Sequence, residues 1–359
     1  MRRVSKLAAV TLAGALALTG CATSSSDGSS SNASSGSSDC GGGEFGKQVG
    51  LAYDVGGRGD QSFNDAAARG MDQAVAEFDL VPKEQEPRDG ESDEDKVERM
   101  RQLAEDGFNP IFGVGYAYAA PIKTIAAQCA DVNFAIIDEV VEDVPNVTSL
   151  VFAEEQGSYL AGVAAALKTE TDRVAFIGGV NTPLIQKFEA GFVQGVTDTN
   201  PDVQVDVQYI SQPPEMSGFN DPAAGKSVAN GLMDAGADVI FTAAGGSGAG
   251  AIEAIAAKNT EDSPRWAIGV DSDQYNQETL AQYKDVILTS MVKNVDGAVY
   301  EYIKSTVEGE PQTGVQRHDL STDGVYLATS GGYIDDIAEQ LEEAKQKIIS
   351  GEIEVATTP

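Results

Sequence analysis

Short apolar runs alternate with longer amphipathic stretches along the chain from Lys47 onward. Runs of roughly four to eight residues bounded by Gly, Pro, Asn or Asp are typical of strands, and apolar residues recurring at helical spacing are typical of helices. In the first half, strands are predicted at Lys47–Asp54, Leu80–Glu86, Pro110–Val114, Asn133–Ile137 and Thr148–Phe152. Helices are predicted at Asn64–Phe78, Asp93–Asp106 and Ala119–Cys129. This alternation favours a parallel sheet with helices on both faces.

A second series of the same kind follows a helix predicted at Glu154–Lys168. Its strands are predicted at Arg173–Ile177, Val203–Ile210, Asp238–Thr242 and Trp266–Val270. Its helices are predicted at Pro183–Val196, Pro222–Ala235 and Gly250–Lys258. Two successive series exceed the usual size of one compact domain. The chain is therefore predicted to be an α/β protein of two lobes, each with a doubly wound, mainly parallel sheet.

Two further strands are predicted at Val286–Met291 and Gly324–Ala328. We expect them to return the chain to the first lobe and back again, so that three crossings make a hinge. The predicted N-terminal lobe comprises residues 47–152 plus 272–315, and the predicted C-terminal lobe comprises residues 153–271 plus 316–359.

The first twenty residues have the pattern of a bacterial signal peptide. Three basic residues precede the apolar run Leu7–Leu18, which is too short to span a bilayer. The sequence Leu18-Thr19-Gly20-Cys21 resembles a lipobox, so residues 1–20 are predicted to be removed and Cys21 to carry lipid. Ordinary secretory cleavage beside an unmodified cysteine is the alternative. Residues 21–46 are mostly Ser and Gly and are predicted to form a flexible tether.

The net charge of −32 narrows the range of partners. Such a chain repels the phosphates of nucleic acid and anionic lipid headgroups. No later apolar stretch is long enough for a membrane span, so we expect attachment to the outer side of the cell membrane through the lipid anchor only. His318 is the only histidine, and no residues have metal-ligand spacing, so we expect no metal, no other cofactor and no nucleophile-plus-base catalysis.

Two cysteines remain besides the predicted lipidation site. Cys40 lies in the tether and Cys129 lies near the end of a predicted helix. Outside the cytoplasm these residues can form a disulfide that pins the tether to the first lobe. They can also remain unpaired, and the sequence does not decide between the two.

Several candidate site residues follow predicted strands, where ligands of doubly wound sheets bind. Asp54, Asp138 and Asp271 each end a strand, and Gly245 and Gly246 lie between a strand and the next helix. Glycine there leaves backbone N–H groups accessible to a ligand. Asp54 can instead cap the glycine-rich turn or the helix that follows it, and the glycines can serve only a tight turn.

The segment Asp60-Gln61-Ser62-Phe63-Asn64 resembles the D-x-S-F-N signature of the basic membrane protein family, whose members are similar to purine nucleoside receptor A lipoproteins. Further motifs follow in family order: Gly113-Val114-Gly115-Tyr116, Phe134-Ala135-Ile136-Ile137-Asp138, Glu155 to Gly162, Phe176-Ile177-Gly178-Gly179, Gly269 to Gln274 and Thr289 to Lys293. The resemblance implies the type I fold of periplasmic binding proteins. It also implies a monomer that encloses a nucleoside between its lobes and serves the permease and ATPase subunits of an ABC importer.

The resemblance implies that a purine lies between two aromatic rings. Phe63 is expected to be one ring and Phe219 the other, with Phe192 as the alternative to Phe219. Stacking is worth about 1–3 kcal/mol per base and tolerates any base. Phe63 can instead anchor the start of a helix in the core.

The resemblance also implies polar contacts to base and sugar. Asp54 is expected to bind the edge of the base. Asp138 is expected either to shape the base pocket or to support the residues that line it without touching the ligand. Asn64 either donates to the ligand or serves as a helix N-cap. Asp271 and Lys293 are expected to hold the ribose, or else to form a buried structural ion pair. The rival function is a sugar or signal-molecule receptor of the same fold that feeds a sensor.

Overall fold

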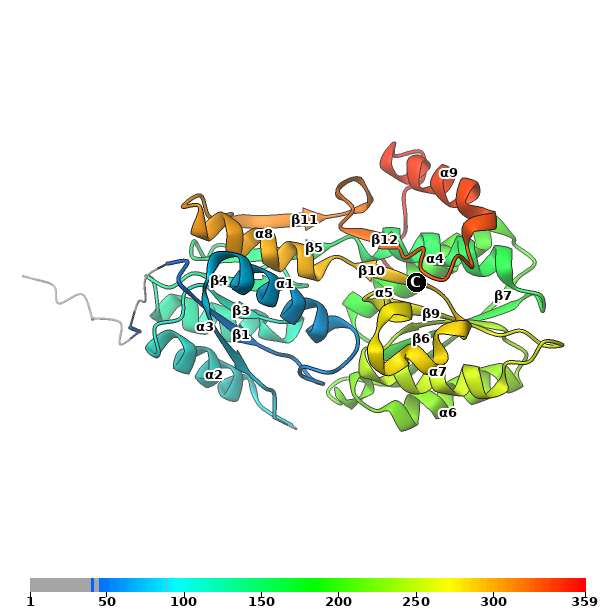
Figure 1. The fold of residues 1–359 in the computed structure, drawn as a ribbon, viewed down its shortest axis with the longest axis horizontal. Helices are drawn as coiled ribbons and strands as arrows, with labels where there is room; N and C mark the ends of the chain where they lie inside the picture. The colour runs from blue at the N-terminus through cyan, green and yellow to red at the C-terminus, as the bar shows by residue number, and fades with distance from the viewer. Residues whose placement is uncertain (1–39, 42–44, 89) are drawn as a thin grey trace, which may run out of the picture. The chain divides into compact units, whose positions relative to one another are not determined.

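The computed structural model describes residues 40–41, 45–88 and 90–359. The predicted signal peptide, the predicted lipid anchor at Cys21 and most of the predicted tether lie outside these residues. The described chain forms two six-stranded sheets with helices packed on them (Figure 1). None of its helices has the length and apolarity that a membrane span requires.

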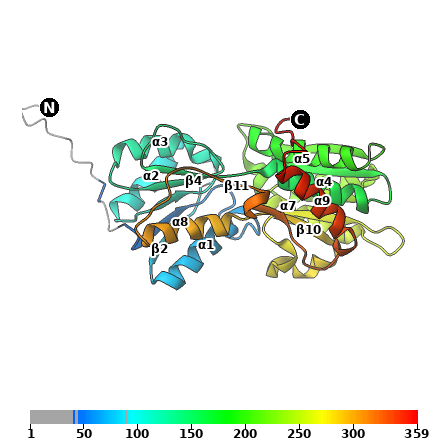
Figure 2. The ribbon, with the colours of Figure 1, turned by 90° about the horizontal axis from the view of Figure 1, so that it is seen from above.

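The first sheet has the strand order β11-β5-β4-β3-β1-β2, and all neighbouring strands are parallel. Its strands are β1 (Gln48–Ala52), β2 (Val81–Gln85), β3 (Ile111–Gly113), β4 (Phe134–Ile137), β5 (Val147–Phe152) and β11 (Gly314–His318). Its helices are α1 (Phe63–Phe78), α2 (Asp93–Glu105), α3 (Ala119–Gln128) and α8 (Val295–Val307). Helices α1 and α8 lie side by side, and α2 packs against α3 (Figures 1 and 2). The central strands β3 and β4 are fully buried, as expected for a sheet covered on both faces.

The second sheet has the order β12-β10-β9-β8-β6-β7 and is parallel except for β12, which runs antiparallel to β10. Its strands are β6 (Arg173–Val180), β7 (Gln204–Ser211), β8 (Val239–Ala243), β9 (Trp266–Asp271), β10 (Ile287–Lys293) and β12 (Val325–Leu327). Its helices are α4 (Glu154–Lys168), α5 (Pro183–Thr199), α6 (Pro222–Asp234), α7 (Gly246–Lys258) and α9 (Ala338–Ile349). Short 3₁₀ helices are η1 (Tyr116–Tyr118), η2 (Ser217–Phe219), η3 (Gln274–Asn276), η4 (Glu278–Val286), η5 (Leu320–Thr322) and η6 (Asp335–Ile337). The predicted fold class, two doubly wound α/β sheets, is confirmed.

The chain passes between the sheets three times, after β5, after β10 and after β11. The expectation that Val286–Met291 returns to the first lobe is wrong, because β10 pairs with β9 and β12 in the second sheet. The return strand is instead β11, a half-exposed edge strand beside β5. Residues 272–293 therefore belong with the second sheet. The sequence of a buried apolar strand does not show which of two sheets the strand will join.

Helix α7 begins at Gly246, four residues earlier than predicted, and one of its glycines serves helix packing. A Cβ added to Gly250 would lie 1.8 Å from the Pro222 carbonyl oxygen, and one on Gly225 would lie 2.1 Å from the Ser247 carbonyl oxygen. Helices α6 and α7 thus approach closely at glycine, and the glycine-rich run opens a helix instead of forming a loop.

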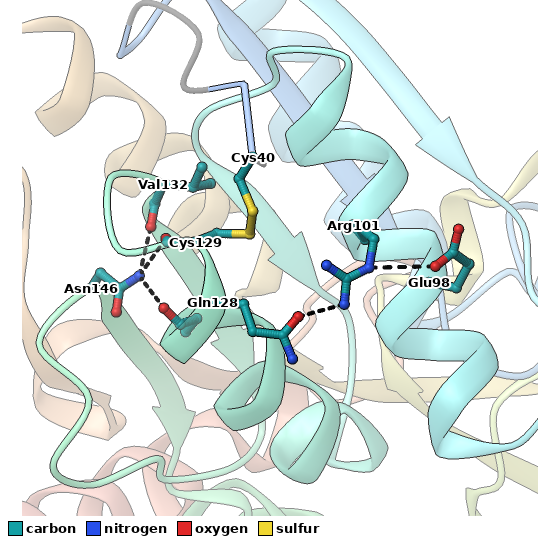
Figure 3. Close-up of a disulfide and its surroundings, with 8 residues drawn as sticks. Cys40, Glu98, Arg101, Gln128, Cys129, Val132 and Asn146 are labelled. Atoms are coloured by element: carbon teal, nitrogen blue, oxygen red, sulfur yellow. Dashed lines mark hydrogen bonds and ion pairs between the residues drawn. A yellow bond between two sulfur atoms is a disulfide. The ribbon is translucent and has the colours of Figure 1, made fainter. Parts of the chain in front are cut away.

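Cys40 and Cys129 form a disulfide, with a Cα–Cα distance of 5.5 Å (Figure 3). Cys129 follows α3 and is fully buried. Beside it, the Asn146 side-chain amide donates to the carbonyl oxygens of Cys129 and Val132 (Figure 3). Of the two alternatives left open by the sequence, the structure has the disulfide, which ties Cys40 to the first lobe.

Candidate ligand-binding site

A cavity lies between the two lobes, at the carboxyl ends of the strands. Its lining residues come from both lobes: Asp54, Val55, Asp60, Phe63, Asn64, Gly115, Tyr116, Asp138, Leu184, Ile185, Phe188, Phe219, Ala243, Gly245, Val270, Asp271 and Lys293. Its empty volume is about 580 Å³, counted with its opening to solvent. Sites for small molecules typically combine apolar walls with a few polar groups, as this cavity does.

The structure brings most of the predicted site residues to this cavity. Those that line it are Asp54, Phe63, Asn64, Asp138, Phe219, Gly245, Asp271 and Lys293. Phe192 and Gly246 do not line it. Phe192 is fully buried against Phe241 in the core of the second lobe, with ring centroids 5.5 Å apart. One turn earlier on α5, Phe188 lines the cavity instead, and Gly246 forms the first residue of α7.

Lys293 stands at the centre of a buried cluster of charges. Its Nζ lies 2.5 Å from Asp138 Oδ2, 3.8 Å from Asp271 Oδ1 and 3.9 Å from Glu154 Oε1. Burial by itself lowers the pKa of Lys293, but the carboxylates of Asp138, Asp271 and Glu154 raise it above the ordinary value. Lys293 is therefore a buried cation held in place by carboxylates from both lobes.

Two carboxylates of this cluster have pKa values raised by burial. Burial raises the pKa of Asp271, while Lys293 and a hydrogen bond from Ser62 lower it. Burial also raises the pKa of Glu154 to about 7, against the opposing charge of Lys293. Glu154 does not line the cavity, and it contacts Lys187 Nζ at 3.4 Å on its other side.

Aromatic rings enclose the ammonium group of Lys293. Its Nζ lies 4.7 Å from the ring centroid of Phe63, 5.5 Å from that of Phe152 and 5.6 Å from that of Phe188. Such cation–π contacts stabilise the charge in a desolvated site. Phe63 thus both lines the cavity and contacts the Lys293 ammonium group.

Asp138 and Asp271 leave their strands in left-handed backbone conformations, with φ of 72° and 60°. A non-glycine residue pays roughly 1–2 kcal/mol for this conformation, and such residues concentrate at functional sites. Both carboxylates line the cavity. Asp138 Oδ1 is buried and accepts no hydrogen bond from any described residue, so it is an acceptor available to a ligand.

Asp54 lies at the end of the cavity formed by the first lobe. Burial raises its pKa to about 6, although the backbone N–H of Val55 donates to Oδ1 at 2.8 Å. A Cβ on Gly115 would lie 2.5 Å from Asp54 Oδ2, so glycine is needed beside this carboxylate. Tyr116 follows, with its hydroxyl 3.6 Å from Met216 Sδ of the second lobe and its pKa raised to about 12 by burial.

Asn64 lines the cavity but uses its side chain within the protein. Its Nδ2 donates to Asp60 Oδ2 at 2.9 Å, and its Oδ1 accepts from the Asp54 backbone N–H at 3.1 Å. It is not the N-cap of α1, because that helix begins at Phe63 after Ser62. Asp60 organises the same loop by accepting from the backbone N–H groups of Ser62 and Asn64.

Several lining residues were missed by the sequence analysis. Tyr116 stands in a motif that carried the family resemblance, but it received no role. Leu184, Ile185 and Phe188 begin the helix after β6, and the rule that ligands bind beyond strand ends points to that segment too.

The polar and aromatic cavity between two mainly parallel sheets is the kind of site in which two-lobed α/β proteins hold a small molecule. The sequence model of the Bmp family, described as "ABC transporter substrate-binding protein PnrA-like", matches residues 47–358. The chain belongs to this family, as the resemblance predicted, and it is a substrate-binding protein of the ABC transporter type.

Two relatives and one solved structure are similar to this chain over most of its length. The chain is 31% identical to the ABC transporter nucleoside-binding protein BmpA of Lactococcus lactis, over 99% of each chain. It is 35% identical to a CD4+ T-cell-stimulating antigen of Listeria innocua, over 87% of this chain and 88% of the relative. An ABC transporter solute-binding protein of Aeropyrum pernix has a similar structure, with a TM-score of 0.76, 27% identity and coverage of 87% of this chain and 93% of that one.

Proposed function

We propose that this protein binds a purine nucleoside in the cavity between its lobes and delivers it to the permease of an ABC importer. The observation that carries the proposal is the composition of one cavity. It joins aromatic rings from both lobes, Phe63 and Phe219, to a carboxylate in the first lobe and to the cluster around Lys293. A relative that is named a nucleoside-binding protein, similar along nearly its whole length, supports the same ligand class.

The first lobe and the second lobe each supply one ring for the base. Phe63 begins α1 and Phe219 ends η2, and both line the cavity. Stacking on such rings contributes about 1–3 kcal/mol per base and does not depend on which base is bound. Asp54 supplies the selectivity among bases, because an ionised carboxylate accepts hydrogen bonds from the ring and exocyclic N–H groups of a base. A hydrogen bond of this kind contributes about 1.5–3 kcal/mol.

The acidic end of the cavity suits the ribose. Asp271 Oδ1 and Asp138 Oδ1 are acceptors for hydroxyl groups, and Lys293 Nζ is a donor between them. Asp271 faces the vicinal hydroxyls in this arrangement, and Lys293 shares its hydrogen bonds between Asp138 and the sugar. The ligand is thereby held by both lobes, so binding favours their closed arrangement, which a transporter can distinguish from the open one.

Calorimetric titration with inosine, guanosine, adenosine, cytidine and ribose tests the ligand class. We expect purine nucleosides to bind with dissociation constants between about micromolar and nanomolar. Ribose is expected to bind at least a hundredfold more weakly than inosine. Equal affinities for ribose and inosine would remove the role of base stacking and favour a sugar receptor of the same fold.

We further propose that the protein is held at the outer face of the cell membrane by lipid on Cys21. The support is the leader of residues 1–20 and the lipobox-like Leu18-Thr19-Gly20-Cys21. Mass spectrometry of the mature amino terminus tests this: a diacylglycerol-modified Cys21 is expected. Release of the wild-type protein into the medium, with an unmodified cysteine, would contradict it.

A further inference from the structure

The loop before α1 reaches from the first lobe into the second. The Ser62 hydroxyl donates to Asp271 Oδ2 at 2.7 Å and lies 3.3 Å from the Val270 carbonyl oxygen. In return, the Ser272 hydroxyl donates to the Ser62 carbonyl oxygen at 2.8 Å. Ser62 is fully buried, and Asp60 fixes its backbone by accepting from its N–H at 2.9 Å.

The preceding residue, Gln61, makes a second set of contacts between the lobes. The Gln274 side chain donates to the Gln61 carbonyl oxygen at 3.1 Å. The Thr279 hydroxyl donates to the Gln61 side chain. Neither Gln61 nor Thr279 lines the cavity. These hydrogen bonds join the lobes through residues outside the cavity lining. The hydrogen bond from Ser62 differs, because its acceptor, Asp271, lines the cavity.

We propose that Ser62 is a positioning residue that orients Asp271 from the opposite lobe and so couples lobe closure to recognition of the sugar. Its hydrogen bond occupies Oδ2 of Asp271 and leaves Oδ1 on the side of Lys293. The carboxylate is then fixed in orientation only when the lobes are closed. Asp54, which is assigned to the base, instead accepts its hydrogen bond within the first lobe, from the Val55 N–H. This inference rests on the proposed nucleoside function.

Ser62 and Asp271 are both buried, so loss of the hydrogen bond between them should have a large effect. Asp271 sits in a left-handed backbone conformation, with its carboxylate removed from water. A buried carboxylate oxygen without a donor is costly, so removal of the Ser62 hydroxyl favours rotation of Asp271 away from its place. The loss should therefore fall on the part of the ligand that Asp271 touches.

The test compares inosine with its free base, hypoxanthine, by calorimetric titration of the full-length mature protein. Ser62→Ala is expected to weaken inosine at least tenfold and hypoxanthine less than twofold. Thr279→Val, which removes another hydroxyl bond between the lobes, is the matched control and is expected to change both affinities by the same small factor. The double variant Ser62→Ala with Asp271→Ala is expected to bind inosine no more weakly than Asp271→Ala alone, because Ser62 acts through Asp271.

Equal losses of inosine and hypoxanthine in Ser62→Ala would show that Ser62 only holds the lobes together, and would overturn the proposal. Fully additive losses in the double variant would do the same. Thermal unfolding of the apo variants identifies a folding defect, and Ser62→Cys then provides a second variant of similar size. Failure of the wild-type protein to bind inosine would instead overturn the nucleoside function, so the two failures are distinct.

Discussion

Lys293 and Asp138 form an ion pair between the two lobes in the wall of the cavity, with Nζ 2.5 Å from Oδ2. Lys293 ends β10 in the second sheet and Asp138 follows β4 in the first sheet. The pair therefore exists only when the lobes are together. When they separate, Glu154 of the second lobe, with Oε1 at 3.9 Å, remains beside the ammonium group. The sequence analysis expected Lys293 either to hold the ribose together with Asp271 or to form a buried ion pair with Asp271. The structure makes Asp138 the nearer carboxylate, with Asp271 Oδ1 at 3.8 Å.

Loss of Lys293 should destabilise the protein more than loss of Lys187, a half-exposed lysine nearby. Lys293→Met leaves buried carboxylates without their cation, and breaking a buried pair typically costs about 3–5 kcal/mol. Lys187→Met, which removes the half-exposed partner of Glu154, is the control and is expected to cost less, because Lys293 remains beside Glu154 in that variant. Urea unfolding of the apo proteins measures both, and similar values for the two variants would contradict a central role for Lys293.

Asp271→Ala should separate sugar recognition from base recognition. Because Asp271 is assigned to the ribose, the variant is expected to lose at least tenfold in affinity for inosine while retaining that for hypoxanthine. Calorimetry with the two ligands measures this difference. An unaltered inosine affinity would place the sugar elsewhere.

Phe63→Ala should weaken inosine and hypoxanthine alike, because a stacking ring acts on the base. A loss of about 1–3 kcal/mol in binding free energy is expected. Phe192→Ala is the control from the core: it should lower the free energy of unfolding by about 3–5 kcal/mol while nucleoside affinity of the folded protein is retained. A larger loss of affinity in Phe192→Ala than in Phe63→Ala would contradict the assignment of the rings.

The stability of the apo protein should depend on pH through Asp54. Burial raises the pKa of Asp54 to about 6 in the folded protein, against about 3.9 when unfolded. The folded state thus binds this proton more tightly, so the contribution of Asp54 to stability is fully present below about pH 4 and is lost as the pH rises through 6. Asp54→Asn should therefore stabilise the apo protein at pH 8, by up to about 3 kcal/mol, and the difference should shrink toward pH 4.

The same variant should bind nucleosides more weakly at pH 8, because the ionised acceptor for base N–H groups is gone. Urea unfolding at pH 8 and pH 5, with calorimetry at pH 8, measures both effects. A destabilised apo Asp54→Asn protein at pH 8 would show that the carboxylate serves the fold instead of the ligand.

The sequence predicted the two-sheet fold and most of the cavity because both follow from local pattern. Apolar runs mark strands, and the rule that ligands bind beyond strand ends led to Asp54, Asp138 and Asp271. The prediction was wrong for β10, because the apolar pattern of a buried strand does not show which sheet the strand joins. The helices α8 and α9 were not predicted.

The direction of side chains on a helix was also beyond the sequence analysis. Phe188 and Phe192 lie one turn apart on α5, yet only Phe188 reaches the cavity. The contacts between Ser62 and Asp271, and between Lys293 and Asp138, join residues of different lobes. Such pairs depend on how the lobes close, which no local pattern encodes.

A crystal structure of the mature protein grown with excess inosine tests the central claim most directly. The account predicts the hypoxanthine ring between Phe63 and Phe219, its edge toward Asp54, and the ribose hydroxyls within hydrogen-bond distance of Asp271 and Lys293. An empty cavity, or inosine bound only outside it, would contradict the account.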